Sequence, residues 1–178
     1  MVRNYSEYGV GKLSPPFSKE DIIDEYDRSS GLENEFEKVK WGSHQSMVNR
    51  HKLASDLLPL ASGVRWLDIG CGTGSLQKIA CSQYPGVEAV GVDLNVKLIQ
   101  YAHARNIPGA TFLSGDVAEF QSNKFEVISA IGVVQKLNYP LDRFFGFVSR
   151  LLSENGCLYL DTKNRNWTAF KNNKLKPE

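Results

Sequence analysis

The spacing of apolar residues changes near Gly63, and the two parts of the chain predict different structures. Before this glycine the apolar residues recur every three or four positions, as on one face of a helix. Residues 18–21 have the form of a capping box, which predicts a helix over residues 19–29. Ser43 can cap a second helix that continues to about Leu60. The apolar face of this second helix would carry Met47, His51, Ala54, Leu57 and Leu58.

After Gly63, short runs rich in β-branched residues alternate with helical stretches. Strands are predicted over residues 64–69, 87–92, 111–113, 125–131 and 157–161, and helices over residues 74–83, 95–104 and 140–152. The strand runs are nearly all apolar, as a sheet covered on both faces requires. Strands separated by helices imply right-handed crossovers, so we predict an α/β fold with a doubly wound, mostly parallel sheet. We expect residues 1–60 to form a helical lid and residues 61–178 to form the sheet domain.

Composition and charge limit the partners of this chain. Its 178 residues are enough for one domain with one core. The net charge of +1 gives no electrostatic footprint for nucleic acid or an anionic membrane, so we expect neither as a partner. No apolar run approaches the roughly 18 residues of a membrane span, and the first residues hold no apolar signal core. Cys71, Cys81 and Cys157 lack metal-ligand spacing, so we expect no metal site. They are an odd number and unclustered, so we expect a protein of the reducing cytoplasm.

The most informative segment is Asp68–Gly74, with the sequence DIGCGTG, where a strand ends in an aspartate and three alternating glycines lead into a helix. Glycines let the backbone pass close to a ligand, and a helix start presents unpaired N–H groups. Ligands of open α/β sheets bind at the carboxyl ends of the strands, where this turn lies. A plain strand–turn–helix connection is one alternative. The dinucleotide fingerprint G-x-G-x-x-G is another, but Ser75 stands at its third glycine.

This segment resembles the first motif of class I S-adenosylmethionine-dependent methyltransferases, with little variation from it. The resemblance implies a Rossmann-like methyltransferase fold with S-adenosylmethionine as cofactor. In that family the glycine turn packs against the methionine part of the cofactor, and the aspartate helps to hold its amino group. The residues assigned to the cofactor on this ground are Asp68, Gly70, Cys71, Gly72 and Gly74.

Two later acidic residues extend the resemblance. Asp93 closes the second strand, where a carboxylate can accept two hydrogen bonds from a ribose diol, and the family places Leu94 against the adenine. Taken alone, Asp93 is equally well explained as a helix cap, and NAD-binding folds also place an acid here. Asp116 and Val117 resemble the family's third motif, in which the aspartate meets the adenine amine. An ordinary turn aspartate is the alternative there.

The strand over residues 125–131 is similar to the family's fourth strand, although Glu126 stands where aspartate is usual. The end of that strand lies beside the reactive sulfonium in the family. The resemblance therefore makes Ile131 a cofactor contact and Gln135 a candidate on the substrate side. A buried central strand would explain the same apolar run.

Residues 40–50 look like a helical entry segment found in some small-molecule methyltransferases. In those relatives such segments close over the cofactor, so Trp41 and Arg50 are assigned to it, with the guanidinium pairing with its carboxylate. A surface helix with a solvated arginine is the alternative. No strong acid–base constellation appears, and His44 and Gln135 are the catalytic candidates. Methyl transfer does not demand a base, because alignment of donor and acceptor can supply much of the acceleration.

The family's sheet usually has seven strands, but here the fifth ends near Asp161 and only a short helix around residues 167–170 can follow. Two strands are missing by this count. We expect either a piece of a longer protein or a short form completed by another subunit, with a possible homo-oligomer through the exposed sheet edge.

The sequence thus predicts transfer of a methyl group from S-adenosylmethionine to a small-molecule acceptor, with S-adenosylhomocysteine as the product. A non-catalytic module that binds S-adenosylmethionine is the first alternative. A NAD-dependent oxidoreductase is the second, and the G-x-G-x-G spacing disfavours it.

Overall fold

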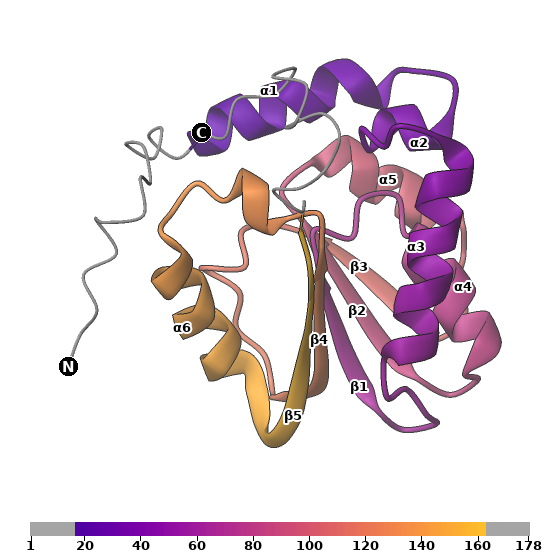
Figure 1. Cartoon of the computed structure of the whole chain (residues 1–178), viewed down its shortest axis with the longest axis vertical. Helices are drawn as coiled ribbons and strands as arrows, with labels where there is room; N and C mark the ends of the chain where they lie inside the picture. The colour runs from indigo at the N-terminus through magenta and orange to yellow at the C-terminus, as the bar shows by residue number, and fades with distance from the viewer. Residues whose placement is uncertain (1–16, 163–178) are drawn as a thin grey trace, which may run out of the picture.

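The computed structural model describes residues 17–162 of the chain. A five-stranded sheet lies at its centre, and every strand pair is parallel (Figure 1). The strands are β1 (Arg65–Ile69), β2 (Glu88–Asp93), β3 (Ala110–Ser114), β4 (Phe125–Ile131) and β5 (Leu152–Asp161). Their order across the sheet is β3-β2-β1-β4-β5, so the chain builds outward from β1 in both directions. The predicted doubly wound α/β fold is confirmed.

Helices cover both faces of this sheet. They are α1 (Lys19–Ser30), α2 (Glu35–Lys38), α3 (His44–Leu57), α4 (Ser75–Gln83), α5 (Val96–Ala104) and α6 (Leu141–Leu151), and the 3-10 turn η2 (Val134–Lys136) follows β4. Figure 1 shows α6 on one face of the sheet and α3 with α4 on the other. Helices α1 and α2 lie across the carboxyl ends of the strands, where β1 ends.

Alternation of side chains along the central strands divides the core in two. On one side Trp66 and Val127 pack with residues of α3 and α4, among them Ala80. On the other side Leu67 packs with Phe144 of α6. Phe144 is fully buried, and truncating such a side chain to alanine typically costs about 3–5 kcal/mol. Both faces are therefore apolar, as the nearly continuous apolar strands predict.

Helix α3 shares its core with the sheet. Ala54 of α3, with Leu58 and Leu60 just after it, packs in the same cluster as Trp66. Within residues 17–162, α1 and α2 lie over the strand ends, so they can cover a ligand there. The division into a lid over residues 1–60 and a separate sheet domain stays a prediction.

The helix limits at the N-terminal end follow local capping. Ser18 Oγ accepts a hydrogen bond from the Asp21 N–H at 3.0 Å, and the Asp21 carboxylate accepts one from the Ser18 N–H at 3.2 Å, which completes the predicted capping box. Ser43 Oγ caps α3 by accepting from the Ser46 N–H at 3.1 Å. The four-residue helix α2 was not predicted, because one turn is too short to give a periodic apolar pattern.

The largest difference from prediction lies in β5, which begins at Leu152, directly after α6. The strand was predicted to begin only at residue 157, and that start is wrong. Phe125 pairs with Leu152 and Val127 with Cys157, so the additional residues of β5 form a bulge against β4. Gly156 lies so close to β4 that an added Cβ would be 2.9 Å from the Glu126 carbonyl oxygen. Gly156 therefore allows β5 to approach β4 closely, and it does not form a turn.

The predicted helix around residues 167–170 lies outside the described residues. Within residues 17–162, no helix is both long enough and apolar enough to cross a membrane. The described part of the chain also holds no group of three or more His, Cys, Asp or Glu residues placed to bind a metal ion.

Candidate active site

A cavity of about 930 Å³ opens at the carboxyl ends of β1, β2 and β4, with part of its wall formed by α1. Its volume is in the range of small-molecule sites, about 300–1,000 Å³. The residues assigned from sequence that line it are Trp41, Arg50, Asp68, Gly70, Cys71, Gly72, Asp93, Leu94, Asp116, Val117, Ile131 and Gln135. Two others do not: Gly74 lies behind the turn, and His44 is exposed at the start of α3.

The glycine turn after β1 has a backbone that other residues adopt with difficulty. Gly70 and Gly72 have φ values of 71° and 55°, in the left-handed region. An added Cβ on Gly70 would come within 2.3 Å of Val133 Cγ2, and one on Gly72 within 2.9 Å of Val39 Cγ1. Two loops thus rest directly on this turn. Gly74 faces the other way, and a Cβ there would meet the Phe112 ring at 2.8 Å.

Helix α2 is fastened to the glycine turn by Glu35. The Glu35 carboxylate accepts a hydrogen bond from Thr73 Oγ1 at 2.7 Å, and also contacts Ser75 Oγ and the Arg105 guanidinium. Burial acts to raise the pKa of Glu35, but these hydrogen bonds and the Arg105 charge together lower it. The carboxylate is therefore ionised, and it holds α2 against the start of α4.

Asp68 lies at the end of a buried chain of polar side chains. Its Oδ1 accepts from Ser129 Oγ at 2.6 Å, its Oδ2 accepts from Gln77 Nε2 at 2.8 Å, and Ser129 Oγ in turn accepts from Trp66 Nε1 at 2.8 Å. Burial raises the pKa of Asp68 to about 7, despite these hydrogen bonds. Ser129 and Gln77 were missed from sequence, although a lone serine within an apolar strand was the available signal.

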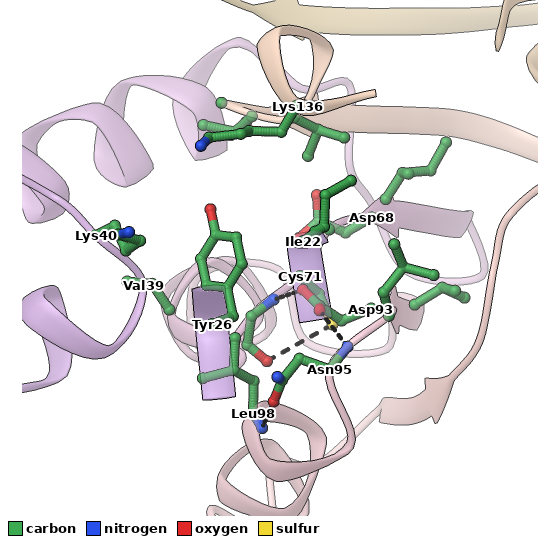
Figure 2. A pocket seen from close by; sticks show the side chains of 18 of the residues that line it. Ile22, Tyr26, Val39, Lys40, Asp68, Cys71, Asp93, Asn95, Leu98 and Lys136 are labelled. Carbon is green, nitrogen blue, oxygen red and sulfur yellow. Dashed lines mark hydrogen bonds between the residues drawn. The ribbon is translucent and has the colours of Figure 1, made fainter. Parts of the chain in front are cut away.

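Asp93 ties the glycine turn to α5. One oxygen accepts from the Gly72 N–H at 2.9 Å, and the other accepts from the Asn95 N–H at 2.9 Å. Burial raises the pKa of Asp93. The helix cap itself is Asn95, whose Oδ1 accepts from the Leu98 N–H at 3.0 Å. Figure 2 shows Asp93, Cys71 and Asn95 clustered on one side of the cavity.

Asp116 lies two residues after the end of β3 and takes part in a turn. Its Oδ1 accepts from the Ala118 N–H at 2.9 Å, and its Oδ2 lies 3.6 Å from Lys19 Nζ of α1. The part of the cavity beside β2 and β3 is therefore lined by the carboxylates of Asp93 and Asp116. Their apolar neighbours Leu94 and Val117 also line it.

Arg50 lines the cavity but already has a protein partner. Its Nε donates to Asp161 Oδ2 at 2.9 Å, and its guanidinium stacks 4.9 Å from the centre of the Trp41 ring. The Trp41 ring also meets the His51 ring edge-on at 5.4 Å. Asp161 is thus a competitor for the carboxylate role that the sequence assigned to the cofactor.

His51 is buried in the wall of the cavity, and its Nδ1 has no hydrogen-bond partner among the described residues. Burial lowers the pKa of His51 to about 4, so the imidazole is neutral at pH 7. A neutral ring nitrogen can accept or donate one hydrogen bond. From sequence, His51 was assigned only to the packing face of its helix.

Three charged side chains face the cavity from the other side. The Glu25 carboxylate of α1 accepts from Lys136 Nζ at 2.7 Å and also contacts Lys40 Nζ. Burial acts to raise the pKa of Glu25, but the two lysines together lower it. Tyr26 lies beside them, and burial, with the Asp93 and Glu25 charges, raises the pKa of its hydroxyl. None of these four residues was assigned from sequence.

A family model described as a methyltransferase domain matches residues 26–177 of the chain. The chain belongs to this family. The motif resemblance in Asp68–Gly74 is thereby confirmed, and in this methyltransferase domain the matched residues include every strand of the sheet and the whole wall of the cavity after Tyr26.

Relatives of this methyltransferase domain are enzymes that act on several kinds of small molecule. The chain is 28% identical over 130 residues to a ubiquinone biosynthesis O-methyltransferase of Pelagibacter ubique, covering 71% of this chain and 52% of that one. It is 31% identical over 113 residues to a trans-aconitate 2-methyltransferase of Methylobacterium nodulans, covering 61% and 43%. The chain spans about half the length of these curated relatives.

Solved structures share the fold of this domain. The [4+2]-cyclase SpnF matches with a TM-score of 0.71 at 19% identity, covering 88% of this chain and 66% of that one. An S-adenosylmethionine-dependent methyltransferase from Thiobacillus denitrificans, solved with S-adenosyl-L-homocysteine, matches with a TM-score of 0.54 at 21% identity, covering 78% and 54%. At these identities the likeness establishes the fold alone.

Proposed function

We propose that this methyltransferase domain binds S-adenosylmethionine and directs its methyl group to a small-molecule acceptor in the same cavity. The observation that carries the proposal is the pair formed by the glycine turn and Asp93. An added Cβ on Gly70 or Gly72 would clash, and Asp93 presents a carboxylate beside that turn at the end of the next strand. The methyltransferases among its relatives support the same activity.

The residues present fit this cofactor. Gly70, Gly72 and Asp68 line the cavity, so the backbone of this turn can contact a ligand's methionine part. We assign the ribose to Asp93 and the adenine end to Asp116, with Leu94, Val117 and Ile131 as apolar walls. Cys71 lies in the same turn, and Trp41 and Arg50 close the opposite side.

When bound, the cofactor supplies a methyl group on a positively charged sulfur, which needs no further activation. The protein's contribution is therefore alignment of the acceptor and exclusion of water. Val39 and Val133 lie against the glycine turn and line the cavity. Gln135, in η2 after β4, is the acceptor-side candidate from the sequence that lines the cavity.

A second candidate function is supported by one comparison. The [4+2]-cyclase among the solved structures covers most of this chain, so the fold also hosts chemistry other than methyl transfer. A domain that binds the cofactor without methyl transfer remains the alternative. Turnover by the full native protein, assayed with radiolabelled S-adenosylmethionine and an acceptor panel, separates the two.

Calorimetric titration with S-adenosylhomocysteine tests the cofactor proposal, with NAD as the control ligand. We expect saturable binding of the homocysteine compound and none of NAD. Asp93→Asn should weaken binding at least tenfold, since it removes the charge that would face the ribose. The matched control is Asp142→Asn, which removes an exposed charge on α6. If a chain that unfolds cooperatively on heating does not bind S-adenosylhomocysteine, the proposal is wrong.

We also infer a cytoplasmic location and self-association. Cys71, Cys81 and Cys157 are all free thiols, which suits a reducing compartment. Within the described residues, β5 is an edge of the sheet and Leu160 on it is exposed, so this edge is the candidate contact between copies. Light scattering coupled to size exclusion checks the second point, and a monomer at micromolar concentration would contradict it.

A further inference from the structure

The side of the cavity opposite Asp93 carries a cluster of two ammonium groups and one carboxylate. Lys40 and Lys136 both contact Glu25, and all three residues line the cavity. Their side chains are 39%, 26% and 22% exposed, respectively, so the charges are reachable from the cavity but not fully solvated. The cluster joins three segments that are far apart in sequence: α1, the stretch between α2 and α3, and η2.

The charges of this cluster do not cancel. Two ammonium groups and one ionised carboxylate leave a net charge of +1. Each ammonium has three N–H donors, and within residues 17–162 the side-chain hydrogen bonds given by Lys40 and Lys136 go to Glu25. Lys136 Nζ also lies 4.5 Å over the Phe17 ring. One further anion placed against the two lysines would neutralise the cluster without displacing Glu25.

We propose that Lys40 and Lys136 recognise a carboxylate of the methyl acceptor, so that the acceptors of this domain are small organic acids. The inference rests on the proposed function and adds the chemical class of the substrate. Glu25 demonstrates the geometry, because a carboxylate already lies between these two lysines.

Neighbouring side chains define the rest of the acceptor. Figure 2 shows the Tyr26 hydroxyl pointing toward the part of the cavity where Lys40 and Lys136 lie, and away from Asn95. Because the pKa of this hydroxyl is raised, it keeps its proton and can donate to the same carboxylate. The adjoining wall contains Ile22, Ile23, Val133, Leu137 and Tyr139. An acid with an apolar body therefore fits this end of the cavity.

A purely structural role is the competing explanation. In that view the ion pairs only fasten α1 over the cavity, and removing any one of the three charges loosens α1 in the same way. Carboxylate recognition instead predicts opposite effects on acid binding. Loss of a lysine weakens it, whereas loss of the Glu25 charge strengthens it by leaving two uncompensated ammonium groups.

The test uses three probes with the same tail: octanoate, octan-1-ol and octylamine. Each is titrated calorimetrically into the full chain, with and without saturating S-adenosylhomocysteine. We expect octanoate to bind at least tenfold more tightly than the other two. Lys136→Met and Lys40→Met should each weaken octanoate binding at least tenfold, and Glu25→Gln should strengthen it severalfold. Lys78→Met, an exposed change of the same charge on α4, is the matched control and should have no effect.

Each outcome separates the two proposals. Octanoate preference without S-adenosylhomocysteine binding overturns the proposed function and leaves the carboxylate site standing. S-adenosylhomocysteine binding with no octanoate binding, or with equal binding of the three probes, overturns the carboxylate site alone. If Glu25→Gln weakens octanoate binding as Lys136→Met does, the ion pairs only hold α1 in place and the inference is wrong. Thermal melting of each variant verifies that it is folded.

Discussion

The two sides of the cavity are held in place by different forces. At the strand ends, Asp68 is buried and Asp93 is half-buried, and both receive hydrogen bonds of 2.6–2.9 Å from side chains or backbone N–H groups. Across the cavity, Glu25 and Lys136 are half-buried and Lys40 is exposed, and these side chains depend on ion pairs with one another. Half-exposed ion pairs contribute little stability, whereas breaking a buried polar network is costly. The difference suggests a rigid cofactor side and an acceptor side that can change with little effect on the fold.

The largest effect is expected at Gly70. Gly70→Ala forces a side chain into the left-handed region, which alone costs about 1–2 kcal/mol, and its Cβ would lie 2.3 Å from Val133 Cγ2. We expect S-adenosylhomocysteine affinity to fall at least about 100-fold, or roughly 2.7 kcal/mol, with a clear loss of stability. Calorimetry and urea unfolding measure both. Gly146→Ala, where nothing lies within 4 Å, is the control and should raise stability by up to about 1 kcal/mol.

Asp68 should make stability depend on pH. Its pKa is raised to about 7 in the folded chain, from 3.8, so between pH 4 and 7 the folded state holds a proton that the unfolded state has lost. Stability contributed by Asp68 therefore falls as pH rises through this window, by at most about 1.4 kcal/mol per pH unit. Asp68→Asn should remove this slope in urea unfolding at pH 5, 6 and 7. An unchanged slope would show that Asp68 titrates normally.

His51 should act in the opposite direction. Its pKa is lowered to about 4 from 6.5, so the unfolded state binds the additional proton between pH 4 and 6.5. Its contribution to stability is present above pH 6.5 and is lost as pH falls toward 4. His51→Gln should therefore make the chain less sensitive to acid than the parent. Exposed His44→Gln is the matched control, and equal acid sensitivity of all three chains would contradict the assignment.

The smallest effect is expected for the acceptor side. Glu25→Gln should lower the free energy of unfolding by no more than about 1 kcal/mol, because the ion pairs it removes are between half-exposed groups. Unfolding in urea at low and high salt measures this value. A loss above about 2 kcal/mol would show that the two sides of the cavity are not held differently.

The cofactor side could be predicted from sequence because its residues follow strands that adjoin in the sheet. Asp68, Asp93 and Asp116 lie within two residues of the ends of β1, β2 and β3, and parallel pairing brings those ends together. The doubly wound topology followed from the alternation of strands and helices for the same reason. Family resemblance added their separate roles, which remain proposals.

The acceptor side could not be predicted, because its residues meet only through tertiary packing. Glu25 and Lys136 are 111 positions apart and belong to no shared motif. The pairing of Arg50 with Asp161 is equally distant and was missed for that reason. The bulge in β5 depends on how Leu152 and Gly156 fit against β4. In the sequence alone, a glycine at this place indicates a turn more readily than a bulge.

Residues 39 and 40 join these two sides. Val39 packs against the position where a Cβ on Gly72 would lie, and its neighbour Lys40 pairs with Glu25. Lys40 has a φ of 59°, a left-handed conformation that turns the chain sharply between these contacts. Two adjacent residues thus connect the tightly packed glycine turn to the ion pairs of the acceptor side, where fewer contacts restrict the side chains. Divergence among descendants of this protein is expected to concentrate at Lys40 and its acceptor-side partners Glu25 and Lys136, so that acceptor preference changes while Val39 and the glycine turn stay the same.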